Sequence, residues 1–308
     1  MAKIDLDKML VKIKNTQWAL SDIDWDAPGA DLVTAEQWPQ LKEFMADLMW
    51  IEHVGARAFA AMAKKAPTDT LREIYTYFHA EEQRHANAEM ALMKRWGMLD
   101  GDELPEPNIN LRLVIEWLDR YSDEMPVYVL GTVVPMLEIA LDGALCKFLL
   151  DTVDDPVCHQ AFEKINDDES RHLGVGFTVM EMQGHGATYI KMVEMAAQLM
   201  DPRLILGIAS YFPLLNKMRD NVVAMGLSEE KLYACMRKFE KIGGRTEDGR
   251  RNVWFQIIKF HSRWVVDRNN RFYHAPVDAV VKLTGYIPRR VLPAVPSWVK
   301  ELTYKPTA

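Results

Sequence analysis

The chain is poor in cysteine and contains no cysteine pair of the Cys-x-x-Cys type. Its 308 residues include three cysteines, Cys146, Cys158 and Cys235. This usage excludes a paired-cysteine metal module and favours the reducing cytoplasm as the location of the protein. Recognisable motifs for flavin, nicotinamide or an iron–sulfur cluster are also missing. Redox chemistry in this chain would therefore require electrons from an external donor.

A secretory signal and a membrane span are not expected either. The first twenty residues, MAKIDLDKMLVKIKNTQWAL, form a charged amphipathic segment, unlike a signal peptide. The longest apolar run, Pro126 to Leu150, is interrupted by Glu138, Asp142 and Lys147 and has no flanking basic clusters. The net charge of −7 disfavours nonspecific binding to nucleic acid. We expect a cytoplasmic protein without a nucleic-acid partner.

Two matched sets of acidic and histidine residues are the most informative feature of the sequence. Each set is an isolated glutamate followed by a Glu-x-x-His motif: Glu52, Glu82 and His85, then Glu138, Glu169 and His172. The two glutamates are 30 residues apart in the first set (52 to 82) and 31 in the second (138 to 169). This distance completes one long helix, a turn and the return to the same height on an antiparallel neighbour. Four carboxylates and two imidazoles would then meet inside a helical bundle.

The patterns around these residues place them in a core. Glu52, Glu138 and Glu169 each interrupt a stripe of apolar residues spaced three or four apart, and the stripe around Glu82 is less regular. Carboxylates withdrawn from water without a partner cost several kcal/mol each, so four of them need a common compensating charge. Two Fe ions, with Mn as the alternative, are the simplest source, because carboxylates and imidazoles suit these metals.

The helical patterns predict an all-α protein, a four-helix bundle with additional C-terminal helices. The helices expected in the bundle span residues 35–65, 67–97, 123–152 and 155–183. Further helices are expected near 5–17, 111–121, 187–199, 202–225, 228–242 and 250–268, followed by a proline-punctuated tail. The expected domains are an N-terminal helix and connector over 1–34, the bundle over 35–185, and a helical extension over 186–308 that packs on the bundle or lines a cavity.

At the predicted ligands the chain resembles the ferritin-like di-iron carboxylate superfamily. The strings AEEQRH (Ala80 to His85) and DDESRH (Asp167 to His172) look most like the two motifs of soluble acyl-carrier-protein desaturases and related bacterial di-iron oxygenases. The resemblance covers roughly residues 40–185. It implies that Glu81 orients His172 and that Asp168 orients His85. The motif arginines, Arg84 and Arg171, would pair with these acids.

Several positions depart from known members of this superfamily. Glu89 stands where the radical-generating subunit of ribonucleotide reductase has its tyrosine, which argues against a radical role. We interpret Glu89 as a solvated residue at the end of the bundle, with a polar group near the cavity as the alternative. Ile165 replaces the additional histidine of aromatic-amine N-oxygenases. The remaining histidines are interpreted as surface or ordinary hydrogen-bonded residues: His53, His79, His159, His185, His261 and His274.

The resemblance implies a non-haem di-iron oxidoreductase. It would activate O2 to hydroxylate, desaturate or otherwise oxidise an apolar or aromatic organic substrate, with the six residues of the two sets as ligands and Glu82 and Glu169 as bridges. A ferredoxin or flavoprotein reductase would supply electrons, and a homodimer is possible. Gly176 would leave space for a ligand one turn above His172. Two alternatives remain: a ferroxidase or iron-storage protein, and a purely structural bundle without metal.

Overall fold

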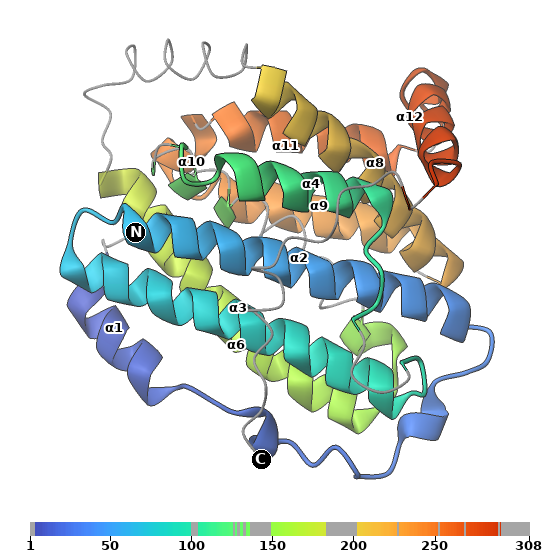
Figure 1. Cartoon of the computed structure of the whole chain (residues 1–308), viewed down its shortest axis with the longest axis horizontal. Helices are drawn as coiled ribbons and strands as arrows, with labels where there is room; N and C mark the ends of the chain where they lie inside the picture. The colour runs from blue at the N-terminus through green and yellow to red at the C-terminus, as the bar shows by residue number, and fades with distance from the viewer. Residues whose placement is uncertain are drawn as a thin grey trace.

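The computed structural model describes most of the chain (Figure 1). The described residues are 4–99, 104–125, 127, 130–131, 134–135, 149–182, 202–226, 228–251, 253–267, 269–288 and 290. All regular secondary structure in these residues is helical, as the sequence predicts. The expected helix over 187–199 and most of the one over 123–152, including Glu138, lie outside the described residues.

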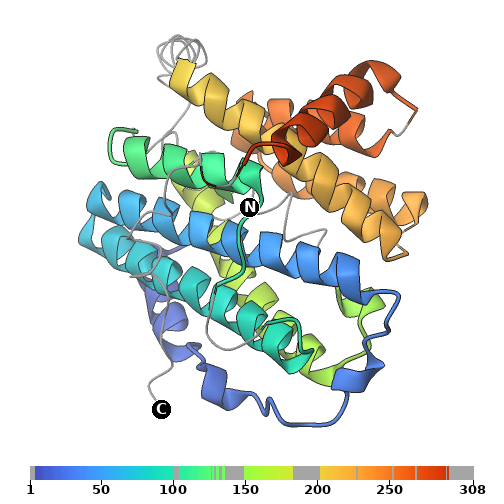
Figure 2. The same cartoon turned by 45° about the vertical axis from the view of Figure 1, so that its right-hand side comes forward.

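Three long helices carry the described members of the two sets. They are α2 (Trp38–Lys64), α3 (Asp69–Arg95) and α6 (Pro156–Met182). The α3 helix begins after Thr68, whose side-chain oxygen accepts a hydrogen bond from the Leu71 amide at 3.2 Å and so caps the first turn. Figures 1 and 2 show α2 and α3 side by side, with α6 passing behind them. The site therefore lies between three helices whose positions the sequence predicts.

The other helices surround this group. The shorter and C-terminal helices are α1 (Leu6–Asn15), α4 (Ile109–Tyr121), α8 (Pro202–Ala224), α9 (Glu229–Gly243), α10 (Glu247–Arg251), α11 (Val253–Val266) and α12 (Arg271–Gly285). The α1 helix contacts α3 and α6, whereas α4 and α8 cover α2 on its other side. The α9, α11 and α12 helices lie beyond α8 (Figure 2). The domain boundaries after residues 34 and 185 stay predictions.

The prediction of an irregular tail after residue 268 is wrong, because Arg271–Gly285 forms α12. Pro276 lies inside this helix and leaves the carbonyl of Phe272 without its usual amide partner. Phe272 is 98% exposed, so water can satisfy that carbonyl and the helix tolerates the proline. The short α10 lies between α9 and α11 and is not among the expected helices. No helix of the described residues is both long and apolar enough to cross a membrane.

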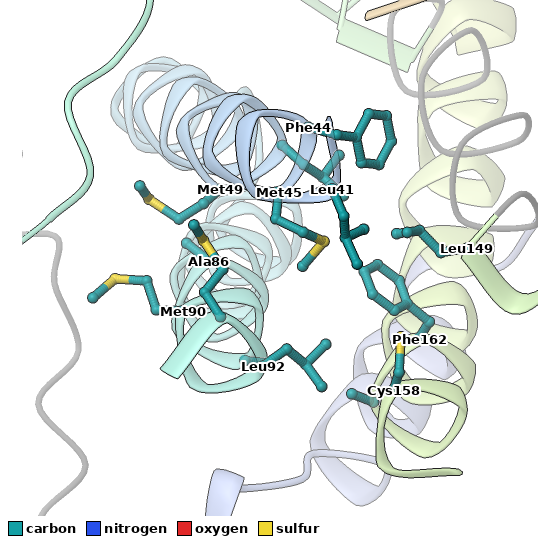
Figure 3. Close-up of a cluster of buried hydrophobic side chains, with 14 of the residues drawn as sticks. Leu41, Phe44, Met45, Met49, Ala86, Met90, Leu92, Leu149, Cys158 and Phe162 are labelled. Carbon is teal, nitrogen blue, oxygen red and sulfur yellow. The ribbon is translucent and has the colours of Figure 1, made fainter. Parts of the chain in front are cut away.

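Two apolar clusters lie on either side of the polar site. Figure 3 shows side chains of α2, α3 and α6 packed in the first cluster, among them Met45, Met90 and Phe162. The second cluster contains Phe59 of α2 and Phe78 of α3. Their buried side chains exclude water from both sides of the site. Electrostatic interactions between the charged groups of the site are therefore stronger than they would be at the surface.

Candidate metal centre

Four side chains of the two sets converge where α2, α3 and α6 meet. They are Glu52, Glu82, His85 and Glu169; each is buried and offers one ligand atom, and these atoms lie within 4.8 Å of one another. The Nδ1 atom of His85 is 3.3 Å from Glu52 Oε2 and 3.2 Å from Glu169 Oε1. Residues from distant parts of the chain therefore direct their ligand atoms at one another.

His172 lies beside this cluster on α6. Its Nδ1 atom is 3.1 Å from Glu82 Oε1 and 3.3 Å from Glu169 Oε2. The rings of His85 and His172 are stacked, with centroids 6.1 Å apart. The structure thus brings together five of the six predicted ligands. The sixth, Glu138, lies outside the described residues.

The chemistry of this donor set fits cations. Burial, followed by the charges of Glu52 and Glu169, raises the pKa of Glu82 well above its usual value. Burial lowers the pKa of His172, but the nearby carboxylates, Glu169 first, more than offset this and raise it well above its usual value. In the absence of a bound cation, the negative carboxylates therefore favour the protonated forms of Glu82 and His172. Metal ions would supply the same positive charge, and carboxylate oxygen and imidazole nitrogen suit Fe and Mn.

Glu81 and Asp168 bond to the outer nitrogens of the two imidazoles. The His172 Nε2 atom is 2.9 Å from Glu81 Oε2, and His85 Nε2 is 2.9 Å from Asp168 Oδ2. These are the pairings that the resemblance implies. With Nε2–H donated to a carboxylate, each ring presents its unprotonated Nδ1 to the centre, which is the form that binds metal.

The motif arginines balance the charge of these two acids. Arg171 lies 3.1 Å from Glu81 Oε1, and Arg84 lies 3.2 Å from Asp168 Oδ2. Arg171 also pairs with Asp168. These two acids and two arginines form a network with no net charge. The network therefore does not compensate the negative charge of Glu52, Glu82 and Glu169 at the centre.

The segment after α1 contributes contacts that the sequence does not predict. The Trp18 indole N–H donates to Asp168 Oδ2 at 2.8 Å, and Arg84 donates to Gln17 Oε1 at 3.0 Å. The Arg84 guanidinium also lies over the Trp18 ring, 4.8 Å from its centroid. No spacing rule links a connector residue to a motif about 150 positions later, so the sequence carries no signal for this contact.

The absence of a side chain at Gly55 leaves room for the Glu82 carboxylate. A Cβ atom at residue 55 would lie 2.2 Å from Glu82 Oε2 and 2.9 Å from Glu82 Cδ. Gly55 is three residues after Glu52 on α2, so it lies on the same helix face, which faces α3. The carboxylate of Glu82 thus fills space that any larger residue would occupy.

The expectation that Gly176 leaves space for a ligand is wrong. A Cβ atom at residue 176 would lie 2.5 Å from Cγ of Pro135. The small residue accommodates the proline ring of a neighbouring segment. The space beside Gly176 is therefore filled by Pro135.

The preferred interpretation of Glu89 as a solvated residue is also wrong. Its side chain is fully buried, and neither carboxyl oxygen has a hydrogen-bond partner among the described residues. The alternative, a polar group near the centre, agrees with the structure. The sequence pattern was ambiguous because the apolar stripe of this helix is the least regular of the four.

His53 is another residue whose environment differs from the prediction. It is fully buried beside Trp50, with ring centroids 5.3 Å apart, and in the part of the chain that the structure describes neither ring nitrogen has a hydrogen-bond partner. Burial lowers its pKa to about 4, so the ring is neutral at pH 7. Ordinary hydrogen bonds hold the other described histidines: His79, His159, His261 and His274. His185 lies outside the described residues.

Solved structures resemble this arrangement of helices. No protein-family model matches the chain, and no curated protein matches its sequence. A glycine-to-leucine variant of an R2-like ligand-binding oxidase, with an aerobically reconstituted Fe/Fe cofactor, is 16% identical; the match covers 86% of this chain and 92% of that one, with a TM-score of 0.51. The chain has a ferritin-like fold.

A second match comes from the same kind of protein. A tyrosine-to-phenylalanine variant of an R2-like ligand-binding oxidase, with an aerobically reconstituted Mn/Fe cofactor, is 16% identical over the same shares of the two chains, with a TM-score of 0.49. At 16% identity the first match, with its TM-score of 0.51, shows the fold alone, and the activity is argued from the site. The ferritin-like resemblance found at the motifs thus extends to the fold of the chain.

Proposed function

We propose that this protein is an O2-activating dimetal oxidase. The observation that carries the proposal is the buried cluster of Glu52, Glu82, His85 and Glu169, with ligand atoms within 4.8 Å of one another. The proposed ligands are these four residues together with Glu138 and His172, and the metals are two Fe ions or one Mn and one Fe. The Fe/Fe cofactor named for the similar solved structure supports the choice of iron, and carboxylate and imidazole ligands suit Mn as well.

The protein's own residues have three tasks in this function. Glu82 and Glu169 lie between the two histidines and are the proposed bridging ligands. Glu81 and Asp168 hold the imidazole rings in the tautomer that binds metal. The two apolar clusters exclude water from the site. When bound, the metals supply the capacity to reduce O2.

An apolar or aromatic organic molecule is the proposed substrate, and hydroxylation or desaturation the proposed reaction. Mass spectrometry of molecules retained by the purified protein tests the substrate class directly. A ferredoxin or flavoprotein reductase is the proposed electron donor, and a cytoplasmic homodimer the proposed state of the protein. A purified reductase should support O2 consumption only when the metals and the organic substrate are present.

The metal assignment is tested by Glu138→Ala. We expect the wild type to hold two metal ions per chain and the variant to lose most of the metal while keeping its helix content. Elemental analysis and far-ultraviolet circular dichroism measure the two properties. Stoichiometric metal in the variant would remove Glu138 from the ligand set. Iron mineral that accumulates without an oxidised organic product would favour the ferroxidase or storage alternative.

A further inference from the structure

Glu89 is a buried acid for which the ligand set above has no use. The buried acids of the described residues are Asp47, Glu52, Glu81, Glu82, Glu89, Asp155, Asp168 and Glu169. Among them, Glu89 is the one whose two carboxyl oxygens both lack a hydrogen-bond partner. An unpartnered buried carboxyl group destabilises a protein, because it loses its hydration without replacement. Its presence therefore needs a reason other than packing.

The position of Glu89 on α3 directs it at the metal centre. Glu82, His85 and Glu89 are spaced three and four residues apart, so they share one face of the helix over two turns. The charges of Glu52, Glu82, Glu169 and His85 all act on Glu89. Burial, and then Glu52, raises its pKa well above the usual value. His85, one turn before Glu89 on α3, has its Nδ1 atom 3.3 Å from Glu52 Oε2, so the pair of Glu52 and His85 is the part of the centre next to Glu89 along the helix.

The opposite side of Glu89 is apolar. Its charge contributes to the raised pKa of the Cys158 thiol, after burial and Asp155. Cys158 belongs to the cluster that Figure 3 shows between α2, α3 and α6, where Met90 and Leu92 also pack. Met90 and Leu92 have no hydrogen-bond donor, and the Cys158 thiol, a weak donor, makes no hydrogen bond to Glu89. A leucine or methionine would fill this place in a purely structural core at lower cost.

We propose that Glu89 is a further metal-binding residue, placed to bind the ion held by Glu52 and His85. A cation there would give both oxygens of Glu89 the partner that they lack. The metal-binding face of α3 would then extend from Glu82 through His85 to Glu89. The inference rests on the proposed dimetal function, and it adds a carboxylate to the ligands that the two matched sets provide.

The experiment compares Mn2+ binding by the ion-free wild type with that of Glu89→Gln and Glu89→Leu. The glutamine keeps the size of the side chain but removes the carboxylate, whereas the leucine matches the apolar side of its environment. Asp47→Asn is the matched control, since Asp47 is also a buried acid but pairs with Lys217 at 3.3 Å, away from the centre. Electron paramagnetic resonance of free Mn2+ gives the affinity, and calorimetry of the ion-free proteins gives the melting temperature.

Both Glu89 variants should bind the more weakly held Mn2+ at least tenfold more weakly than the wild type, and Asp47→Asn should bind it within twofold. Ion-free Glu89→Leu should melt at a higher temperature than the ion-free wild type. Wild-type affinity in Glu89→Gln would overturn the inference even if Glu89→Leu fails to fold. A wild type that binds no Mn2+ and no Fe2+ would instead overturn the proposed function, so the two failures are distinguishable.

Discussion

At the scale of single residues, Asp168 links the proposed ligand His85 to the side chains that surround the centre. It contacts His85, Arg84 and Trp18 within 3.2 Å. Burial acts to raise its pKa, but the His85 hydrogen bond and the nearby positive charges hold it well below the usual value. The carboxylate therefore stays ionised and keeps the His85 ring in one orientation. Removing it would also leave the two arginines, Arg84 and Arg171, with Glu81 as the one acid of their network.

Asp168→Ala should weaken metal binding by about 10–100-fold, the usual effect of removing a carboxylate that orients a ligand histidine. The fold should persist, because the apolar clusters do not depend on this residue. Titration with Mn2+ measures the affinity. The control is Asp167→Ala, which removes an exposed acid from the preceding position. Equal affinities in the two variants would show that Asp168 does not support His85.

Gly55 allows a second prediction at this scale. In Gly55→Ala the new methyl group would occupy the place of the Glu82 carboxylate, which must then move away from the centre. We expect metal binding to fall at least tenfold while the ion-free protein keeps its helix content. Gly174→Ala is the control, since its Cβ atom would meet the end of the Ile4 side chain at 3.0 Å. The metal content per chain is measured for both variants. Wild-type metal content in Gly55→Ala would show that Glu82 binds the metal from another rotamer.

At the scale of helices, Asp155 connects the start of α6 to the end of α3 through hydrogen bonds. Its carboxylate accepts hydrogen bonds from Arg95 Nε at 2.8 Å, from the Trp96 indole at 2.8 Å and from the Val157 amide at 3.0 Å. The side chain is fully buried. This group fixes α6 near the end of α3, and the register between these helices sets the separation of the two Glu-x-x-His motifs.

Asp155→Asn should lower the free energy of unfolding by about 3 kcal/mol at pH 7, the cost of breaking a buried ion pair. Burial acts to raise the pKa of Asp155, but the Arg95, Trp96 and Val157 hydrogen bonds more than offset it, so the pKa lies below its usual value. The contribution is therefore complete above about pH 4 and is lost as the pH falls through the folded-state pKa. Urea unfolding should show a wild-type advantage at pH 6 that shrinks toward pH 3. An advantage that stays constant with pH would contradict this role, and Asp154→Asn, at an exposed neighbour, is the control.

At the scale of the whole molecule, periodic patterns predicted what depends on local geometry. The 30-residue step from Glu52 to Glu82 follows from helix length, and α2 and α3 have the predicted positions. Contacts that depend on tertiary packing were not predictable. The Trp18–Asp168 hydrogen bond joins segments 150 residues apart, and Pro135 fills the space beside Gly176. The sequence does not predict the burial of Glu89, because an acid on an irregular apolar stripe is usually exposed to solvent.

The same arrangement predicts how the whole molecule responds to loss of metal. The apolar clusters on both sides of the centre and the neutral network of Glu81, Asp168, Arg84 and Arg171 are complete without an ion. Chelation should therefore leave the helix content unchanged. Free Mn2+ or Fe2+ at 100 times its Kd should add about 2.7 kcal/mol per site to the free energy of unfolding. At about 2–4 °C per kcal/mol, one occupied site raises the melting temperature by roughly 5–10 °C.

Circular dichroism and calorimetry of the chelated and reloaded protein measure both effects. Mg2+ at the same concentration is the control, because it prefers water and oxygen ligands and should stabilise the protein far less at a site with two imidazoles. Loss of most helix content on chelation would show that the ions hold the bundle together. Equal melting temperatures with and without Mn2+ or Fe2+ would show that the buried acids and histidines form a structural network that needs no metal.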